Sequence, residues 1–456
     1  MEKKLELLKK ALPGRVYERP AERYLYAYDA TPIPIKRELP AAVVFPESAQ
    51  EVKKLVEVCY EEEIPLFPRG AGTGLTGGAV PTDGRGVVVS FERMTGLTVR
   101  PEDGLAVAEP GVITEKLQKE AERYGLFYPP DPSSYKYSTL GGNVAENAGG
   151  PRCLKYGTTR DYVLELETVI KEGELLKTGG PVIKDVAGYD LTRLLVGSEG
   201  TLGLFTRITV KLIPKPPARL TLLALFDDLA SMGKAVTRLL SGGVFPSALE
   251  FMDRDAIRAV KQFKPLELPE VEALLLVELD GWPAALKQEA LLAEKLLKEE
   301  GARVRRASNA KESEELWLAR KSLGPALGRI KSGKINEDVV LPRSAIAEAL
   351  PLFKEVGRKY GLEVVVFGHV GDGNLHVNLL YEKEDPEQER RAEEAVNEVF
   401  EIALSFNGSI TGEHGVGLTK KAFLGRQLGP EGLALLKGVK RLFDPKNLFN
   451  PGKLLD

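Results

Sequence analysis

The segment PRGAGTGLTGGAVP, residues 68–81, follows an apolar strand pattern and contains five glycines. Because glycine has no Cβ, such a loop lets backbone N–H groups approach phosphate oxygens closely, and Arg69 adds a fixed positive charge. Gly72, Gly74 and Gly77 match G-x-G-x-x-G, but that fingerprint needs a helix that opens from the loop, and a second strand pattern follows here instead. The sequence favours a diphosphate cradle without a helix over a Rossmann site or a glycine loop that binds no ligand.

Composition and charge argue against several classes of protein. The chain has 456 residues, 43% hydrophobic and 28% charged, which predicts a globular protein of two or three domains. Its formal charge of -3 lacks the basic excess of a nucleic-acid binder. Cys59 and Cys153 are too few for a disulfide framework or an iron–sulfur cluster. Because the N-terminus is charged and no membrane-length apolar run occurs, we expect a cytoplasmic protein, at most recruited to a membrane by a partner.

Strand and helix patterns alternate up to a proline-rich break, PKPP, at residues 214–217, and they resume beyond it. This organisation predicts an α+β protein in three parts: residues 1–214, a sheet-containing domain at 215–407, and a C-terminal segment at 408–456 that folds back onto the first part. Before the break, the patterns predict strands at residues 41–45, 64–67, 86–90, 105–109, 162–170 and 206–213, and helices at 2–11, 49–60 (capped by Ser48) and 114–124. After it, they predict strands at 220–226 and 273–278 and helices at 231–240 and 285–299.

A hairpin pattern occupies residues 363–380, EVVVFGHVGDGNLHVNLL. If Asp372-Gly373 is a two-residue turn, His369 and His376 stand directly opposite each other on one face of the hairpin, close enough to bind one metal ion. A polar sheet face without a metal is the alternative.

The third histidine favours the metal. Residues 408–417, GSITGEHGVG, place Glu413 and His414 between glycines, in a loop. Two imidazoles and a carboxylate with an open position form a catalytic zinc set, although the spacing is not HExxH, and iron or manganese would also suit these ligands.

Several further segments resemble the flavin-contacting loops of one family, the flavoproteins related to vanillyl-alcohol oxidase and p-cresol methylhydroxylase (PCMH). Within that family, the chain is most similar to the glycolate oxidase flavin subunit and to FAD-dependent D-lactate and D-2-hydroxyglutarate dehydrogenases. The resemblance implies a two-part PCMH-type FAD-binding domain, followed by a substrate domain with a mainly antiparallel sheet and flanking helices. The segments, in order after residues 68–81, are PPDPSS (129–134), TLGGNVAENAGG (139–150), LKYGTTRDYV (154–163), LLVGSEGTLG (194–203) and FDPKNLFNPGK (443–453).

The same resemblance implies which residues hold FAD. Some relatives attach the flavin through a histidine near the glycine loop, and no histidine precedes His369 here, so we expect non-covalent FAD. The diphosphate would be held by Arg69, Gly70, Gly72, Thr73, Gly74 and Leu75. The ribityl chain and ring would lie against Pro130, Asp131, Ser134, Gly141, Gly142, Asn143, Asn147 and Gly150. Glu199 and Gly203 would lie near the adenosine, and Asn450 and Lys453 near the ring.

The family motifs GHxGDGNLH and EHG imply roles for the remaining candidates. His369, His376 and Glu413 would bind a divalent metal, with zinc preferred, and His414 would take the proton of a substrate hydroxyl. Asn378, on the same predicted strand face as His376, would form a hydrogen bond to the substrate.

Two basic residues complete the implied substrate site. Arg320, in LWLARK, would bind the substrate carboxylate through its bidentate fork, and Lys334 would assist. Asn336 stands where we align a lysine of the 2-hydroxyglutarate enzymes, and that difference weakens the case for a second carboxylate on the substrate.

The resemblance therefore implies oxidation of a D-2-hydroxy acid, of the glycolate or D-lactate class, to the 2-oxo acid, with hydride transfer to flavin N5. The alternatives are a non-redox FAD enzyme of the alkyl-glycerone-phosphate synthase type, a metal-dependent hydrolase and a non-catalytic FAD-binding scaffold. Electrons would leave to an external acceptor, such as a quinone, an electron-transfer flavoprotein, an iron–sulfur partner subunit or oxygen. We expect a homodimer or a hetero-complex, and no nucleic-acid partner.

Overall fold

The computed structural model describes residues 1–32, 38–266 and 268–455. Their contacts divide the chain into two compact units. The first comprises residues 1–149, 158–215 and 413–456, and the second comprises residues 150–157 and 216–412. The division after Lys215 falls beside the proline-rich break. Residues 150–157 belong to the second unit although the chain on both sides belongs to the first, and this excursion has no counterpart among the predicted boundaries. No helix in the described ranges has both the length and the hydropathy needed to cross a membrane.

The excursion is tied to the second unit by one buried carboxylate. It contains the short helix α6 (Cys153–Tyr156). Lys155 Nζ lies 2.6 Å from Asp280 Oδ1, and the Tyr156 hydroxyl donates to Asp280 Oδ2 at 2.7 Å. Asp280 thus receives an ion pair and a hydrogen bond from the excursion.

The first unit begins with a four-stranded sheet in the order β1-β2-β4-β3. The β2–β4 and β4–β3 pairings are parallel, and the β1–β2 pairing is antiparallel. Ser48 caps α3 by accepting from the Glu51 N–H at 3.2 Å, as the sequence predicts. The elements are β1 (Val16–Tyr17), β2 (Ala42–Val44), β3 (Leu66–Arg69) and β4 (Val87–Ser90), with helices α1 (Glu2–Ala11), α2 (Pro20–Leu25) and α3 (Ala49–Glu61).

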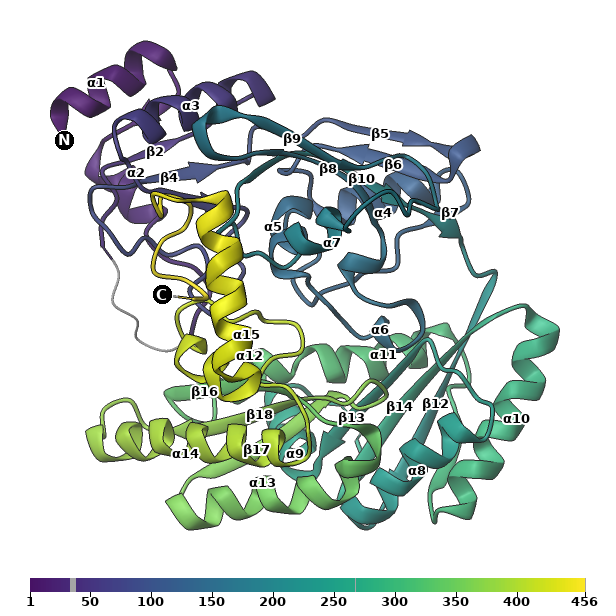
Figure 1. Ribbon diagram of the computed structural model, residues 1–456. Helices are drawn as coiled ribbons and strands as arrows, with labels where there is room; N and C mark the ends of the chain where they lie inside the picture. The colour runs from purple at the N-terminus through teal and green to yellow at the C-terminus, as the bar shows by residue number, and fades with distance from the viewer. Residues whose placement is uncertain (33–37, 267, 456) are drawn as a thin grey trace. The chain divides into compact units, whose positions relative to one another are not determined.

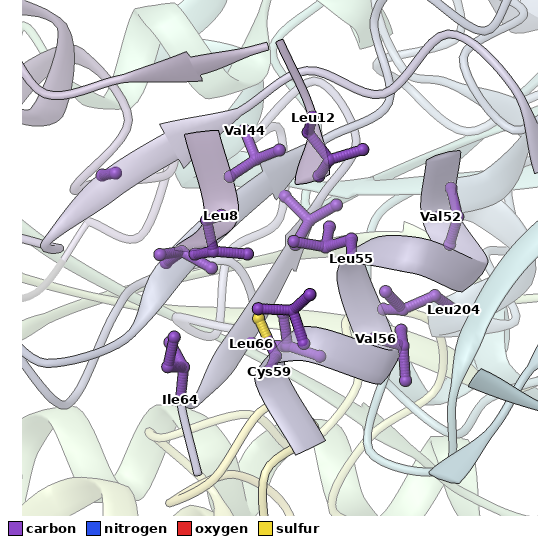
Figure 2. Close-up of a cluster of buried hydrophobic side chains, with 14 of the residues drawn as sticks. Leu8, Leu12, Val44, Val52, Leu55, Val56, Cys59, Ile64, Leu66 and Leu204 are labelled. Carbon is purple, nitrogen blue, oxygen red and sulfur yellow. The ribbon is translucent and has the colours of Figure 1, made fainter. Parts of the chain in front are cut away.

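The core of this part is built from α1, α3 and the sheet (Figure 2). Leu8 and Leu55 pack there with the thiol of Cys59, which is a buried free cysteine, and Leu204 joins them from a strand much later in the chain. Phe449, close to the C-terminus, is buried in the same cluster.

A second, antiparallel sheet completes the first unit, in the order β5-β6-β10-β8-β9. The strands expected at residues 162–170 and 206–213 are confirmed as β8 and β10. The helix α5 was missed because its first turn contains two glycines, which are poor helix formers. The elements are β5 (Leu97–Arg100), β6 (Leu105–Ala108), β8 (Val163–Val169), β9 (Leu175–Gly179) and β10 (Leu204–Lys211), the ribbon of β7 (Leu126–Phe127) and β11 (Ile213–Pro214), and helices α4 (Thr114–Glu122), α5 (Leu140–Glu146), α7 (Leu191–Leu195) and α15 (Lys421–Phe443).

The second unit is built on one antiparallel sheet of seven strands, in the order β15-β12-β14-β13-β17-β18-β16 (Figure 1). The strands are β12 (Ala218–Phe226), β13 (Ala248–Asp253), β14 (Ala273–Gly281), β15 (Arg303–Arg306), β16 (Gly333–Val340), β17 (Glu363–His369) and β18 (Asn374–Tyr381). Helices α9 (Arg254–Phe263), α11 (Ala310–Lys321) and α12 (Leu323–Leu327) pack on one face, and α8 (Leu229–Ser241), α10 (Pro283–Glu299), α13 (Ile346–Tyr360) and α14 (Pro386–Ser405) pack on the other. The predicted α+β class and antiparallel substrate sheet are confirmed.

The register of the β17–β18 hairpin corrects one prediction. His369 pairs with Asn374, and His376 pairs with Phe367, so the two histidines are not directly opposite. The turn is a four-residue loop rather than the two-residue Asp372-Gly373 turn, because the Asp372 N–H donates back to the His369 carbonyl at 3.3 Å. Pairs in this register still place both histidines on one face, as diagonal neighbours.

Candidate active site

A cavity of about 230 Å³ lies in the first unit, where four stretches of chain meet. They are the glycine loop after β3, the start of α5 with the residues before it, the turn at residues 199–205, and the pair Glu413–His414. As predicted, no helix starts on the glycine loop; the next element is β4, which runs parallel to β3.

Glycines let the main-chain segments around this cavity pack closely against one another. A Cβ on Gly70 would lie 2.4 Å from Thr139 Oγ1, and one on Gly141 would lie 2.6 Å from Pro110 Cβ, so neither position has room for a side chain. Gly72 has a φ of +68°, a conformation that side chains rarely adopt. Thr139 also caps α5, since its Oγ1 accepts from the Gly142 N–H at 3.2 Å. The floor of the cavity is therefore backbone.

Arg69 supplies a buried positive charge to this floor. Its Nη1 donates to the Tyr28 carbonyl at 2.5 Å, and its Cζ lies 5.4 Å from the centre of the Tyr26 ring. The Arg69 side chain is buried, and this burial lowers the pKa of its guanidinium from the usual value. A glycine loop with a buried guanidinium fits an anionic diphosphate.

Two acidic side chains and a lysine lie deeper in the same unit. Glu199 accepts from the Val416 and Gly417 N–H groups, each at 2.7 Å, and so fixes the loop that carries His414. Burial, and then the nearby Glu199, raise the pKa of Glu146 well above its usual value. Burial lowers the pKa of Lys453 to about 7.

The structure brings most of the predicted FAD residues to the cavity. The residues that line it are Arg69, Gly70, Gly72, Thr73, Gly74, Leu75, Ser134, Gly141, Gly142, Asn143, Glu199 and Gly203, and His414 lies there too. Pro130, Asp131, Asn147, Gly150 and Asn450 are not among the lining residues.

Two of these five have clear structural tasks instead. Asn147 ends α5 in the left-handed conformation, and its Oδ1 accepts from the Arg160 N–H at 2.8 Å. Asn450 Nδ2 donates to the carbonyls of Gly78 at 2.9 Å and Glu199 at 2.7 Å, and so links the glycine loop to the turn that begins at Glu199. Both side chains hold the cavity wall together.

Sequence reasoning missed several lining residues. Glu146 stands inside the TLGGNVAENAGG segment, where an acidic side chain among small residues was a usable signal. Phe91, Pro110 and Phe205 gave none, because apolar residues in or beside strands are ordinary core residues.

The second unit carries its polar candidates on the sheet face that α9, α11 and α12 cover. His369 and His376 are buried, and their ring centres lie 5.3 Å apart at an angle of 83°. The Gly412 N–H donates to Asp338 Oδ2 at 2.8 Å, and Asp338 pairs with His376 across β16 and β18. Gly412 immediately precedes Glu413 in the chain. Two buried imidazoles on one face fit the nitrogen ligands of a divalent metal.

Arg320 reaches the same face from α11, and it is not a solvated helix arginine. Its Nε lies 2.6 Å from Glu250 Oε2, with 11% of the arginine side chain and none of the glutamate side chain exposed. The other oxygen, Glu250 Oε1, lies 2.6 Å from His369 Nδ1. Phe367 lies under the guanidinium, 4.7 Å from ring centre to Cζ. Glu250 was missed, although an acid within the apolar strand ALEFMD, residues 248–253, was a signal.

Asn378 and Lys334 occupy the β16–β18 end of this face. Asn378 lies on the face of His376, as predicted, and is paired with Asn336. Asn378 Nδ2 donates to the His376 carbonyl at 3.1 Å, while its Oδ1 has no hydrogen-bond partner among the residues that the structure describes. Burial lowers the pKa of Lys334.

Family models match both parts of this sequence. The model for the FAD linked oxidases, C-terminal domain, matches residues 215–454, and an FAD binding domain model matches residues 40–179. The chain belongs to the FAD-linked oxidases. These enzymes are FAD-dependent oxidoreductases, so the hydrolase alternative is set aside. The glycine loop and Arg69 lie within the FAD-binding match of this FAD-linked oxidase, whereas Arg320 and all three histidines lie within the C-terminal match.

Relatives of this FAD-linked oxidase carry two kinds of name. Glycolate oxidase subunit GlcD of Bacillus subtilis (strain 168) is 41% identical over 454 residues, covering 99% of this chain and 96% of the relative. The subunit of that name from Escherichia coli (strain K12) is 38% identical over 93% of this chain and 86% of its own. A D-lactate dehydrogenase of Anaerostipes hadrus is 37% identical over 91% and 89% of the two chains.

Solved structures support the fold of this FAD-linked oxidase. p-Cresol methylhydroxylase with substrate bound matches with a TM-score of 0.83 at 18% identity, covering 99% of this chain and 96% of the other. An alkyldihydroxyacetonephosphate synthase matches with a TM-score of 0.76 at 19% identity, covering 99% and 86%. At these identities the likeness concerns the fold alone.

Proposed function

We propose that this FAD-linked oxidase oxidises a D-2-hydroxy acid of the glycolate or D-lactate class to the 2-oxo acid. The observation that carries the proposal is the buried polar face of the second unit. It places Arg320, which suits a carboxylate, on the same sheet face as two imidazoles, which suit a metal that binds a hydroxyl. A 2-hydroxy acid carries a carboxylate and a hydroxyl on neighbouring carbons. The names of the relatives agree with this substrate class.

Each candidate side chain has one task in this proposal. His369, His376 and Glu413 hold a divalent metal, zinc or else iron or manganese, which when bound polarises the hydroxyl and lowers its pKa. His414 accepts the hydroxyl proton as general base. Arg320 binds and orients the carboxylate.

Lys334 and Asn378 complete the substrate contacts. The Asn378 Oδ1 is buried and has no partner within the described part of the chain, so it is available to accept from the substrate hydroxyl. Lys334 adds positive charge at the same end of the sheet face. Asn336, its neighbour on β16, is neutral, and we therefore favour a monocarboxylic substrate.

The cavity of the first unit holds FAD in this proposal. When bound, the flavin supplies the acceptor for the hydride that leaves the substrate Cα. The glycine loop and Arg69 hold the diphosphate, and Ser134, Gly141, Gly142 and Asn143 line the rest. No histidine or cysteine of the glycine loop is available for a covalent bond, so the flavin is releasable by denaturant.

The proposal includes a partner that removes the electrons. Two of the relatives are named as subunits of glycolate oxidase, and we infer that this chain also works with partner subunits or an external acceptor. A dye-linked assay with and without such a partner tests this part separately.

An anaerobic visible spectrum of the purified protein, titrated with glycolate, D-lactate and L-lactate, tests the reaction. Bleaching of the flavin by glycolate or D-lactate, and not by L-lactate, is the expected result. A bound flavin that none of the three acids bleaches would contradict the proposed substrate class and favour a non-redox reaction of the alkyl-glycerone-phosphate synthase type. Repeating the titration after dialysis against a chelator, and again after adding Zn²⁺ or Mn²⁺, tests the metal.

A further inference from the structure

Glu250 contacts both Arg320 and His369, the two residues that the proposed function uses for the carboxylate and the metal. It lies on β13, with none of its side chain exposed. Its two oxygens are divided between its partners: Oε1 lies 2.6 Å from His369 Nδ1, and Oε2 lies 2.6 Å from Arg320 Nε. We propose that Glu250 is a positioning residue that aligns the metal ligand and the carboxylate-binding arginine together; this inference rests on the proposed function.

The contact to His369 fixes the tautomer of the ring. An ionised carboxylate only accepts hydrogen bonds, so the short contact places the imidazole proton on Nδ1. The lone pair of a neutral ring is then on Nε2, the atom that would bind a metal. A carboxylate in this position also raises the basicity of the ligand and holds its plane.

The contact to Arg320 selects which part of the guanidinium stays free. Glu250 Oε2 lies against Nε as an ion pair without a hydrogen bond between the two atoms. A bidentate carboxylate would then be bound by the terminal Nη1 and Nη2 groups. The Phe367 ring, 4.7 Å from Cζ, restricts the plane of the guanidinium from one side. The ion pair and the ring together leave the arginine little freedom to lose when the substrate binds.

Glu250 lies against a guanidinium in spite of its burial, with Oε2 2.6 Å from Arg320 Nε, and this pairing favours the ionised carboxylate.

A matched control is available on the same strand. Asp253, also buried, pairs with Lys354 and caps α9 by accepting from the Ala256 N–H at 2.7 Å. It is three residues from Glu250, so along a strand it points to the opposite face. Asp253→Asn removes an equally buried carboxylate without touching His369 or Arg320.

The experiment compares E250Q and D253N in the FAD-loaded enzyme after removal of metal by a chelator. Isothermal titration with Mn²⁺ measures metal affinity, and steady-state kinetics with D-lactate and glycolate separate KM from kcat. We expect E250Q to weaken Mn²⁺ binding about 10–100-fold, the usual effect of losing such a partner, and to raise KM. D253N should lower the melting temperature while leaving the Mn²⁺ affinity and KM at wild-type values.

The outcomes separate the inference from the proposed function. If His369→Ala abolishes Mn²⁺ binding while E250Q binds Mn²⁺ and substrate like the wild type, the positioning role is wrong and the metal site stands. If the wild type binds no Mn²⁺, or binds it as well without His369, the metal ligation and the positioning role both fail. E250D keeps the charge with a shorter reach; wild-type affinity and KM in that variant would overturn the inference even if E250Q does not fold.

Discussion

Two buried carboxylates of the second unit and one of the first differ in how their charge is paired. In the second unit Glu250 has Arg320 against it, and Asp253 has Lys354. In the first unit Glu146 Oε2 is buried with no hydrogen-bond partner in the described part of the chain, and the charge that acts on it most strongly is that of Glu199, another carboxylate.

The pKa directions follow this difference. Pairing outweighs burial at Glu250, whose pKa is lowered, whereas burial dominates at Glu146, whose pKa is raised, and at Lys453, whose pKa is lowered. The pairing of Glu250 with Arg320 favours charges that are permanently present, which suits the small anionic substrate proposed above. Glu146 and Lys453 of the first unit lie closer to a change of protonation.

The largest effect should come from the one histidine of the first unit. His414→Ala should lower kcat with D-lactate or glycolate about 10²–10⁴-fold, because a general base contributes that much. The flavin absorbance per protein should stay the same, since the cavity floor is backbone. Stopped-flow reduction of the flavin measures the effect, and a wild-type reduction rate in this variant would rule out His414 as the base.

The next effect should be on stability and should belong to the second unit. Arg320→Met leaves Glu250 buried with only His369 beside it, and breaking a buried pair costs about 3–5 kcal/mol. Thermal unfolding should show a clear loss. Arg303→Met removes the partner of Asp227 at the surface, where the two side chains are 56% and 73% exposed, and should lower the melting temperature much less. Equal losses in the two variants would remove the distinction between paired burial and surface pairing.

A smaller effect of opposite sign is expected in the first unit. Glu146→Gln should leave the FAD-free protein as stable or make it more stable, because a buried acid with a raised pKa becomes a penalty once it ionises. In the folded wild type the proton is retained above the unfolded pKa, so stability falls as pH rises through the raised pKa. The advantage of the variant should therefore grow from pH 5 to pH 8 in melting curves. A destabilised variant would show that Glu146 has a favourable partner.

The smallest effect should be a pH slope due to Lys453. Its folded pKa of about 7 lies below the usual 10.5, so between these values the unfolded state holds a proton that the folded state lacks. Stability should rise with pH across this window and be lost as pH falls towards 7. Lys453→Met should flatten that rise in melting temperature between pH 7 and pH 9. An unchanged slope would mean that the lysine titrates normally.

The sequence predicts the features that local chemistry determines. The glycine loop, the Ser48 cap, the long strands and the shared face of His369 and His376 all follow from residue type and spacing. The hairpin register did not follow, because Asp372-Gly373 suits a two-residue turn as well as the four-residue loop that forms.

The missed features depend on contacts between distant residues. Glu250 lies 119 positions from His369 in the chain, and nothing local to β13 indicates that its two oxygens meet an arginine and a histidine. The excursion at residues 150–157 joins the second unit through Asp280, more than a hundred residues later. Asn450 is predicted to lie near the flavin ring, but its side-chain amide donates hydrogen bonds to the carbonyls of Gly78 and Glu199.

The burial of Phe449 in the core of the first unit sets the order in which the protein can fold during synthesis. The Leu66 N–H donates to the Leu448 carbonyl at 2.7 Å, so the first sheet is completed by residues near the end of the chain. At about 5–20 residues per second, a ribosome needs on the order of 20–80 s to travel from residue 66 to residue 449. The second unit, although it begins later, is fully translated first. The first unit must therefore wait, with part of its apolar core uncovered, until residue 449 has been translated.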